Sequence, residues 1–88
     1  MLEITIEKPT DEQVREMQSC PVWESPCDTF PWEYAEEETC YVTEGEVEVA
    51  TEYGEVLRFG AGDLVTFPKG LKCVWEVRKP VRKHYRFG

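Results

Sequence analysis

Alternating apolar and polar residues run through most of this chain and predict β-strands. Leu2, Ile4 and Ile6 alternate with polar neighbours, which is the period of a half-buried strand. From Glu33 onward, similar short segments follow one another, each separated from the next by a Gly- or Pro-containing turn signal. Short strands that follow one another every eight to twelve residues or so are typical of an all-β sandwich or barrel. We expect about eight to ten of them.

Three glycine and proline positions divide this β region into its expected strands. Gly45 lies between "TCYVTE" and "EVEVAT", which predicts a tight hairpin. Pro68-Lys69-Gly70 predicts a turn between "DLVTF" and "LKCVWEV", and Lys79-Pro80 predicts a break before "VRKHYRF".

The first 27 residues have a different character. Thr10 and Gln13 have the spacing of a capping box, so a short helix is expected over residues 11–17. The prolines that follow permit only short edge strands. We therefore expect a single domain over residues 1–88, in which residues 1–27 form a strand, a helix and a proline-rich arm, and residues 28–88 form the barrel core.

Charge limits the partners that the chain can have. The formal net charge is −8, which repels phosphate backbones and argues against nucleic acid as a partner. The basic run Arg78–Arg86 is either an anion-binding rim or a solvated strand face, and the second is the commoner case. No apolar run is long enough to span a bilayer, and the N-terminus does not resemble a signal peptide, so we expect no membrane association and a cytoplasmic location.

The chain has four cysteines, namely Cys20, Cys27, Cys40 and Cys73. Cys20 and Cys27 lie in one proline-containing stretch and could form a disulfide. Since structural disulfides belong mainly to secreted proteins, free thiols are the expectation.

Two stretches carry the glycine–proline frame of a known pair of motifs. Glu38 and Gly45 have the spacing of the glutamate and glycine in the first motif, and the sequence from Gly62 through Pro68 and Gly70 to Cys73 has the spacing of the second. In this respect the chain resembles the cupin superfamily, whose members are small jelly-roll barrels. It looks most similar to the small stand-alone cupins related to ureidoglycine aminohydrolases and ethanolamine-utilisation proteins.

The resemblance implies an all-β fold, a single-domain antiparallel jelly-roll barrel with one short N-terminal helix. It also implies which side chains share the interior. The positions where cupins place histidine ligands hold Trp32, Tyr34 and Cys73. Because side chains alternate along a strand, an inward Cys73 brings Trp75 and Val77 inward too. The expected ligand pocket is therefore lined by Trp32, Tyr34, Glu38, Cys73 and Trp75.

The chemistry of that set does not suit a metal. The indole nitrogen of Trp32 is only a donor, and Tyr34 binds metals mainly as a phenolate. Glu38 and Cys73 remain, a hard and a soft ligand, so we expect no bound metal and no cofactor. Desolvated Glu38 could instead act as a general acid or base, with Tyr34 supplying a hydroxyl. His84, the only histidine, lies outside both motifs and is expected to be structural.

Three functions remain open at this point. The first is a metal-free cupin that binds a small polar metabolite in the barrel. The second is an enzyme acting on a small nitrogenous or sugar-like compound through Glu38. The third is a structural or interaction module with a filled core. In each case we expect a homodimer, with Val22 and Trp23 of the arm as a candidate contact surface.

Overall fold

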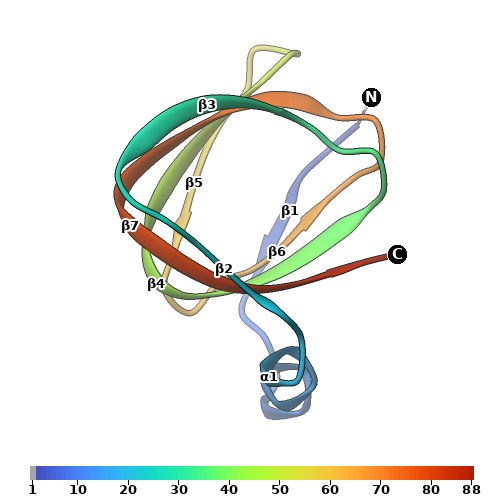
Figure 1. Cartoon of the computed structure of the whole chain (residues 1–88). Helices are drawn as coiled ribbons and strands as arrows, with labels where there is room; N and C mark the ends of the chain where they lie inside the picture. Colours follow the sequence, from blue (N-terminus) through green and yellow to red (C-terminus); the bar gives the residue numbers. More distant parts are fainter. Residues whose placement is uncertain (1) are drawn as a thin grey trace.

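The fold is all-β with one helix. The computed structural model describes residues 2–88, and Figure 1 shows strands arranged in a ring with the helix outside it. This confirms the expected antiparallel jelly-roll barrel with one short N-terminal helix. The elements are β1 (Thr5–Glu7), α1 (Asp11–Gln18), β2 (Val22–Ser25), β3 (Asp28–Glu33), β4 (Glu38–Thr51), β5 (Val56–Gly60), β6 (Leu64–Phe67) and β7 (Lys72–Phe87).

Two long strands, β4 and β7, organise the barrel. They pair with each other from Glu38–Phe87 at one end to Thr51–Cys73 at the other. The first part of β4 also pairs with β6, and its second part pairs with β5. Strand β7 likewise pairs first with β3 and then with β2. The strands thus form one continuous sheet in the order β1-β6-β4-β7-β2, with β5 added beside β4 and β3 beside β7.

Two sequence-based expectations about turns are wrong, because β4 and β7 continue through the positions where turns were expected. Gly45 was expected to form a hairpin turn and Pro80 to separate two strands. Instead, each lies inside a long strand, where the pairing of β4 with β7 shifts register between Val42 and Val47. Gly45 has φ of 100°, which suits glycine. Because each long strand takes the place of two shorter ones, residues 2–88 form seven strands rather than eight to ten.

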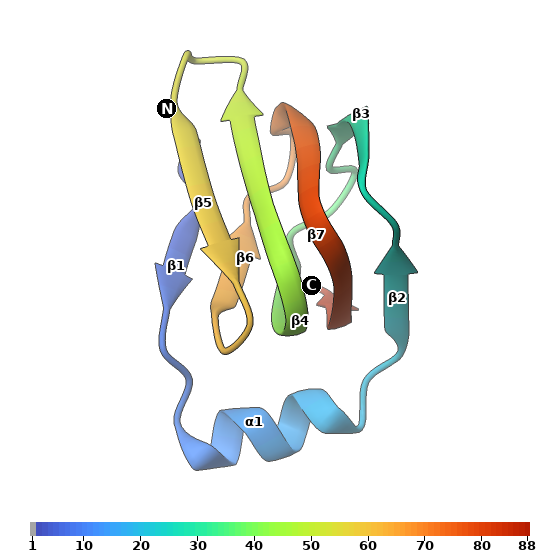
Figure 2. The same ribbon diagram turned by 90° about the vertical axis from the view of Figure 1, so that its left-hand side faces the viewer.

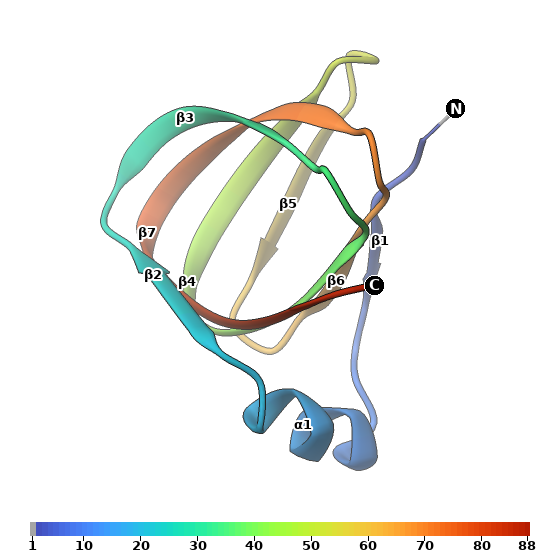
Figure 3. The same cartoon turned by 45° about the vertical axis from the view of Figure 1, so that its right-hand side comes forward.

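Helix α1 begins and ends close to its predicted bounds. The Gln13 amide donates to Thr10 Oγ1 at 3.2 Å, and the Thr10 amide donates to Gln13 Oε1 at 2.9 Å, so the capping box is present. Only Met17 of the helix is buried. Figure 2 shows α1 connecting β1 at one edge with β2 at the other, and Figure 3 shows it again outside the ring.

The core fills much of the barrel. It contains Val42, Val49, Phe67, Leu71 and Trp75, all almost fully buried, along with other aliphatic and aromatic side chains. In the part of the chain that the structure describes, no helix is long and apolar enough to cross a membrane.

Candidate functional site

One cavity lies within the barrel and reaches its surface. It has a volume of about 190 Å³. Aromatic rings form most of its walls, and a carboxylate and an ammonium group supply the polar part. The lining residues are Trp23, Phe30, Trp32, Tyr34, Glu38, Trp75, Lys83, Tyr85 and Phe87.

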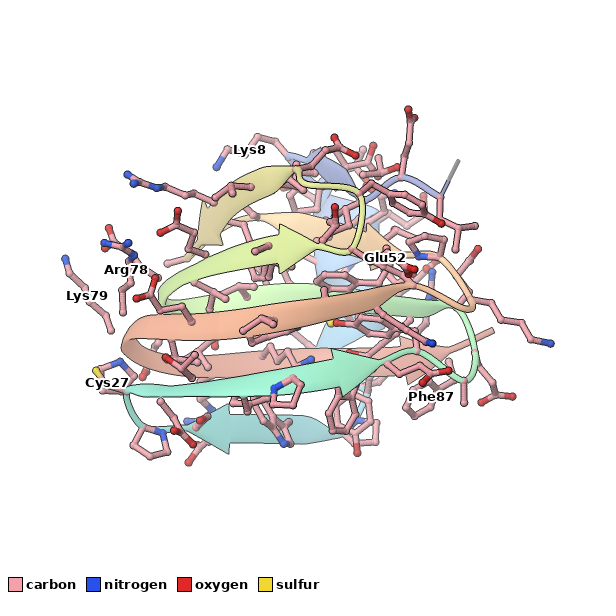
Figure 4. The ribbon with its side chains drawn as sticks, turned by 90° about the horizontal axis from the view of Figure 1, so that it is seen from above. Lys8, Cys27, Glu52, Arg78, Lys79 and Phe87 are labelled. Carbon is pink, nitrogen blue, oxygen red and sulfur yellow. The ribbon has the colours of Figure 1, made fainter. Side chains whose placement is uncertain are left out.

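The mouth of the cavity is marked by its exposed aromatic residues. Trp32 is 49% exposed and Phe87 is 55% exposed, whereas Tyr34 and Trp75 are buried. In Figure 4, Phe87 lies at the opposite end of the barrel from Arg78 and Lys79. The cavity therefore opens at the end where β7 finishes.

The polar part of the cavity is a buried ion pair. Nζ of Lys83 lies 2.7 Å from Oε2 of Glu38, and the two residues are only 6% and 4% exposed. The Cys40 thiol donates to the same Glu38 oxygen at 2.8 Å, and Lys83 also donates to Cys40 Sγ at 3.2 Å. Both hydrogen bonds to Glu38 fall on Oε2.

Aromatic rings surround the ammonium group of Lys83. Its Nζ lies 4.8 Å from the ring centroid of Trp75, 5.0 Å from that of Trp23 and 5.9 Å from that of Tyr85. Ring faces carry partial negative charge, so these contacts offset part of the cost of burying the cation.

Tyr34 is fixed by its neighbours on both sides. Its backbone N–H donates to Leu71 O at 3.0 Å and its carbonyl accepts from the Gly70 N–H at 2.7 Å, so the Pro68–Gly70 turn of the second motif positions it. Its hydroxyl accepts from the Trp75 indole N–H at 3.1 Å. Burial raises the pKa of Tyr34 well above its ordinary value, so the hydroxyl stays protonated.

The residues expected to form the pocket are only partly brought together. Tyr34, Glu38 and Trp75 are buried and line the cavity, and Trp32 lines it from the exposed mouth rather than from the interior. Cys73 is buried but is not among the lining residues, and burial raises the pKa of its thiol to about 11. His84 is half-buried, with Nδ1 3.0 Å from Cys20 O.

Lys83, the residue that completes the site, was missed because it lies in the basic run. Arg78, Lys79, Arg82 and Arg86 of that run are exposed, as a solvated strand face requires, but Lys83 is not. A signal was present in the alternation of Val81, Lys83 and Tyr85, since an inward Val81 carries Lys83 inward as well.

The donor set does not fit the metal centre of metal-dependent cupins. Tyr34 is engaged by Trp75 and protonated, Trp32 offers no lone pair, and Glu38 already holds the Lys83 ammonium. Among the described residues, no group of three His, Cys, Asp or Glu side chains is placed to hold a metal ion. All four cysteines of the chain are free thiols, Cys20 and Cys27 included.

Comparisons with known proteins agree on the family. No curated protein matches the chain. A DUF861 family protein from Thermotoga maritima is 51% identical, with a TM-score of 0.94, over 98% of this chain and 100% of that one. A putative ethanolamine utilization protein Q from Salmonella typhimurium is 27% identical, with a TM-score of 0.65, over 93% of this chain and 66% of its own.

The EutQ protein of Clostridium difficile is similar in fold, with a TM-score of 0.68 at 23% identity over 96% of this chain and 66% of that one. The family described as the EutQ-like cupin domain matches residues 12–85, most of the length of the barrel. This chain therefore belongs to the EutQ-like cupin family.

Proposed function

We propose that this cupin binds a small metabolite in its barrel, without a metal. The observation that carries the proposal is an aromatic cavity in which Glu38 and Lys83, paired with each other, are the charged groups among the described lining residues. Binding sites for small molecules are typically concave and apolar, with a few polar groups that fix orientation.

The size of the cavity limits the ligand. An apolar cavity of about 150 Å³ suffices to bind benzene. At about 190 Å³, the cavity has room for a single ring or a short chain with one polar group. Since Glu38 and Lys83 together carry no net charge, the ligand that fits best is itself close to neutral.

A thermal shift screen of small metabolites tests the proposal. A ligand at about 100 times its dissociation constant stabilises the folded state by about 2.7 kcal/mol. The shift should be lost in Lys83→Met and kept in Arg82→Met, because Arg82 is the exposed neighbour on the other face of β7. A screen in which no compound raises the Tm of the wild type more than that of Lys83→Met would overturn the proposal.

A second candidate is an enzyme acting on a small nitrogenous or sugar-like compound, as the similarity to ureidoglycine aminohydrolases suggested. Glu38 would be the general acid or base, and the protonated Tyr34 would donate a hydrogen bond. The position of Glu38 and Tyr34 in the cavity lining favours it, because an acid or base must lie within hydrogen-bonding reach of the bound compound. Turnover that depends on pH and disappears in Glu38→Gln would separate catalysis from binding alone.

We also propose a homodimer in the cytoplasm, with β2 as the contact edge. Strand β2 pairs with β7 on one side only, and Val22 is 40% exposed. Trp23, the other residue expected at this surface, is half-buried and its ring centroid lies 5.9 Å from that of Trp75, so Val22 offers the more exposed contact. Light scattering that gives the mass of one chain at tens of micromolar would argue against the dimer.

The proposed cytoplasmic location is supported by the exposed free thiol of Cys27, which suits a reducing compartment.

A further inference from the structure

Lys83 brings an amine into the barrel cavity. Among the described residues that line the cavity, no other carries a primary amine, and the side chain of Lys83 is 8% exposed. A lysine among apolar rings with a carboxylate in contact has the surroundings of a covalent nucleophile.

We propose that Lys83 forms a Schiff base with a small aldehyde or ketone held in the cavity. This inference rests on the proposed function, because the carbonyl compound must first bind among the aromatic walls. It adds the class of ligand, a single-ring or short-chain carbonyl compound, and a covalent step at a named atom.

The proton movements can be assigned to one neighbour. Glu38 Oε2, 2.7 Å from Nζ, takes a proton from the ammonium group and leaves the amine lone pair free to attack the carbonyl carbon. The new C–N bond forms as the C=O π bond breaks, and a second amine proton passes to the oxygen. Glu38 then returns its proton to that hydroxyl, which leaves as water, and the product is an iminium ion.

The reaction keeps the electrostatics of the site unchanged. One positive charge on Nζ becomes one positive charge on the iminium, so the Glu38 carboxylate still has its partner. Removing one member of a buried pair leaves an uncompensated charge, which is the costly outcome that this chemistry avoids. The rings of Trp23 and Trp75, about 5 Å from Nζ, would continue to face the cation.

Cys40, the other nucleophile in this network, is unsuited to the role. It is fully buried, it does not line the cavity, and burial raises the pKa of its thiol to about 12. Its contribution is to donate a hydrogen bond to Glu38 Oε2 at 2.8 Å, which holds the carboxylate in place.

Reductive trapping tests the inference directly. The wild-type protein is incubated with benzaldehyde and cyanoborohydride, which adds hydride to the iminium carbon, and benzylated lysines are located by peptide mass mapping. We expect benzylation at Lys83 to exceed that at the exposed Lys79 by about tenfold, because binding raises the local concentration of the aldehyde. In Lys83→Met the other lysines should be labelled as in the wild type, and in Glu38→Gln labelling of Lys83 should fall.

The result that overturns the inference is labelling spread over the exposed lysines with none at Lys83. The peptide mass map of the wild-type protein is enough to decide this, so the test remains valid even if a variant does not fold. Benzyl alcohol, which has the same ring and no carbonyl, separates the two proposals. If it or a metabolite from the screen raises the Tm while Lys83 stays unlabelled, reversible binding stands and the covalent step is wrong.

Discussion

The indole N–H of Trp75 donates a hydrogen bond to the hydroxyl oxygen of Tyr34 at 3.1 Å, and both side chains are about 2% exposed. This contact joins β7 to the segment after β3. It also fixes the positions of two cavity walls relative to each other. The ring of Tyr34 stacks on that of Phe67 with 4.6 Å between centroids, and the ring of Trp75 stacks on that of Phe30 with 6.0 Å between centroids.

Tyr34→Phe removes the acceptor and leaves a buried indole N–H without a partner. We expect a loss of about 1–3 kcal/mol in the free energy of unfolding. Tyr53→Phe is the matched control, because Tyr53 is 44% exposed, and it should change stability by less than about 0.5 kcal/mol. Urea denaturation measures both variants. Equal stabilities would mean that the hydrogen bond has no net effect.

The Glu38–Lys83 pair should behave as a unit when it is mutated. Lys83→Met leaves a buried carboxylate unpaired and should cost about 3–5 kcal/mol. Replacing both residues, with Glu38→Leu and Lys83→Met, should restore most of that stability, because no charge is then buried. A double-mutant cycle from urea denaturation at neutral pH provides the test, and additive losses would contradict it.

Gly45 and Gly54 form a natural comparison at positive φ. A Cβ on Gly45 would meet the carbonyl oxygens of Pro80 and Lys79 and, at 2.7 Å, the Cα of Val81, whereas one on Gly54 would meet nothing within 4 Å. Gly54→Ala should therefore lower the free energy of unfolding by about 1–2 kcal/mol, which is the cost of placing a residue with a Cβ at positive φ. Gly45→Ala should cost more than about 3 kcal/mol, because rigid backbone must move as well. Thermal unfolding ranks the two, and a smaller loss at Gly45 would refute the close approach.

Three of the four thiols, those of Cys27, Cys40 and Cys73, should differ sharply in reactivity. Burial raises the pKa of Cys40 to about 12 and that of Cys73 to about 11, so neither forms much thiolate at pH 8. Cys27 is exposed and should react quickly with Ellman's reagent, while Cys40 and Cys73 should react only after urea is added. Rapid labelling of Cys40 in the folded protein would show that the barrel opens readily.

Asp63 should make the free energy of unfolding depend on pH in the acidic range. Partial burial favours its protonated form, but hydrogen bonds from Lys8 and the Gly60 amide, with the Lys8 charge, outweigh this and hold the pKa of Asp63 below its usual value. A lowered folded-state pKa stabilises the protein above the unfolded pKa of about 3.9, and the contribution disappears as pH falls through the folded value. Asp63→Asn should thus be less stable than wild type at pH 7, and the two stabilities should converge as pH falls through the lowered folded-state pKa of Asp63. A gap that stays constant with pH would contradict this.

The sequence predicted the inward face of β7 but not the whole cavity. Alternation placed Cys73, Trp75 and Val77 inside and Val74, Glu76 and Arg78 outside, and all six are confirmed. The same rule reaches Lys83 through Val81. A lysine inside a barrel is costly unless a carboxylate meets it, and Glu38 is 45 residues away in the chain. Local pattern could not supply that partner.

The sequence pattern also could not predict that β4 continues through Gly45, and the reason is related. A glycine at positive φ suits a hairpin turn and an inward bend equally well. Gly45 takes the second form because β4 continues to pair with β7 on both sides of it, with Glu44 opposite Arg82 and Glu46 opposite Lys79. That pairing depends on residues 33 to 38 positions further along the chain, so the residues around Gly45 do not indicate it.

The length of β4 and β7 has a consequence for how the protein is made. Strands β2, β3 and β4 all pair with β7, so most of the hydrogen-bonding partners of the first half of the chain lie in its last part. Closing such distant contacts makes folding slow, in the range of milliseconds to seconds. It also makes folding all-or-none, since the sheet is not complete without β7. A nascent chain on the ribosome keeps β2, β3 and β4 unpaired with β7 until Lys72–Phe87 emerge, and the unpaired strand edges need protection during that time.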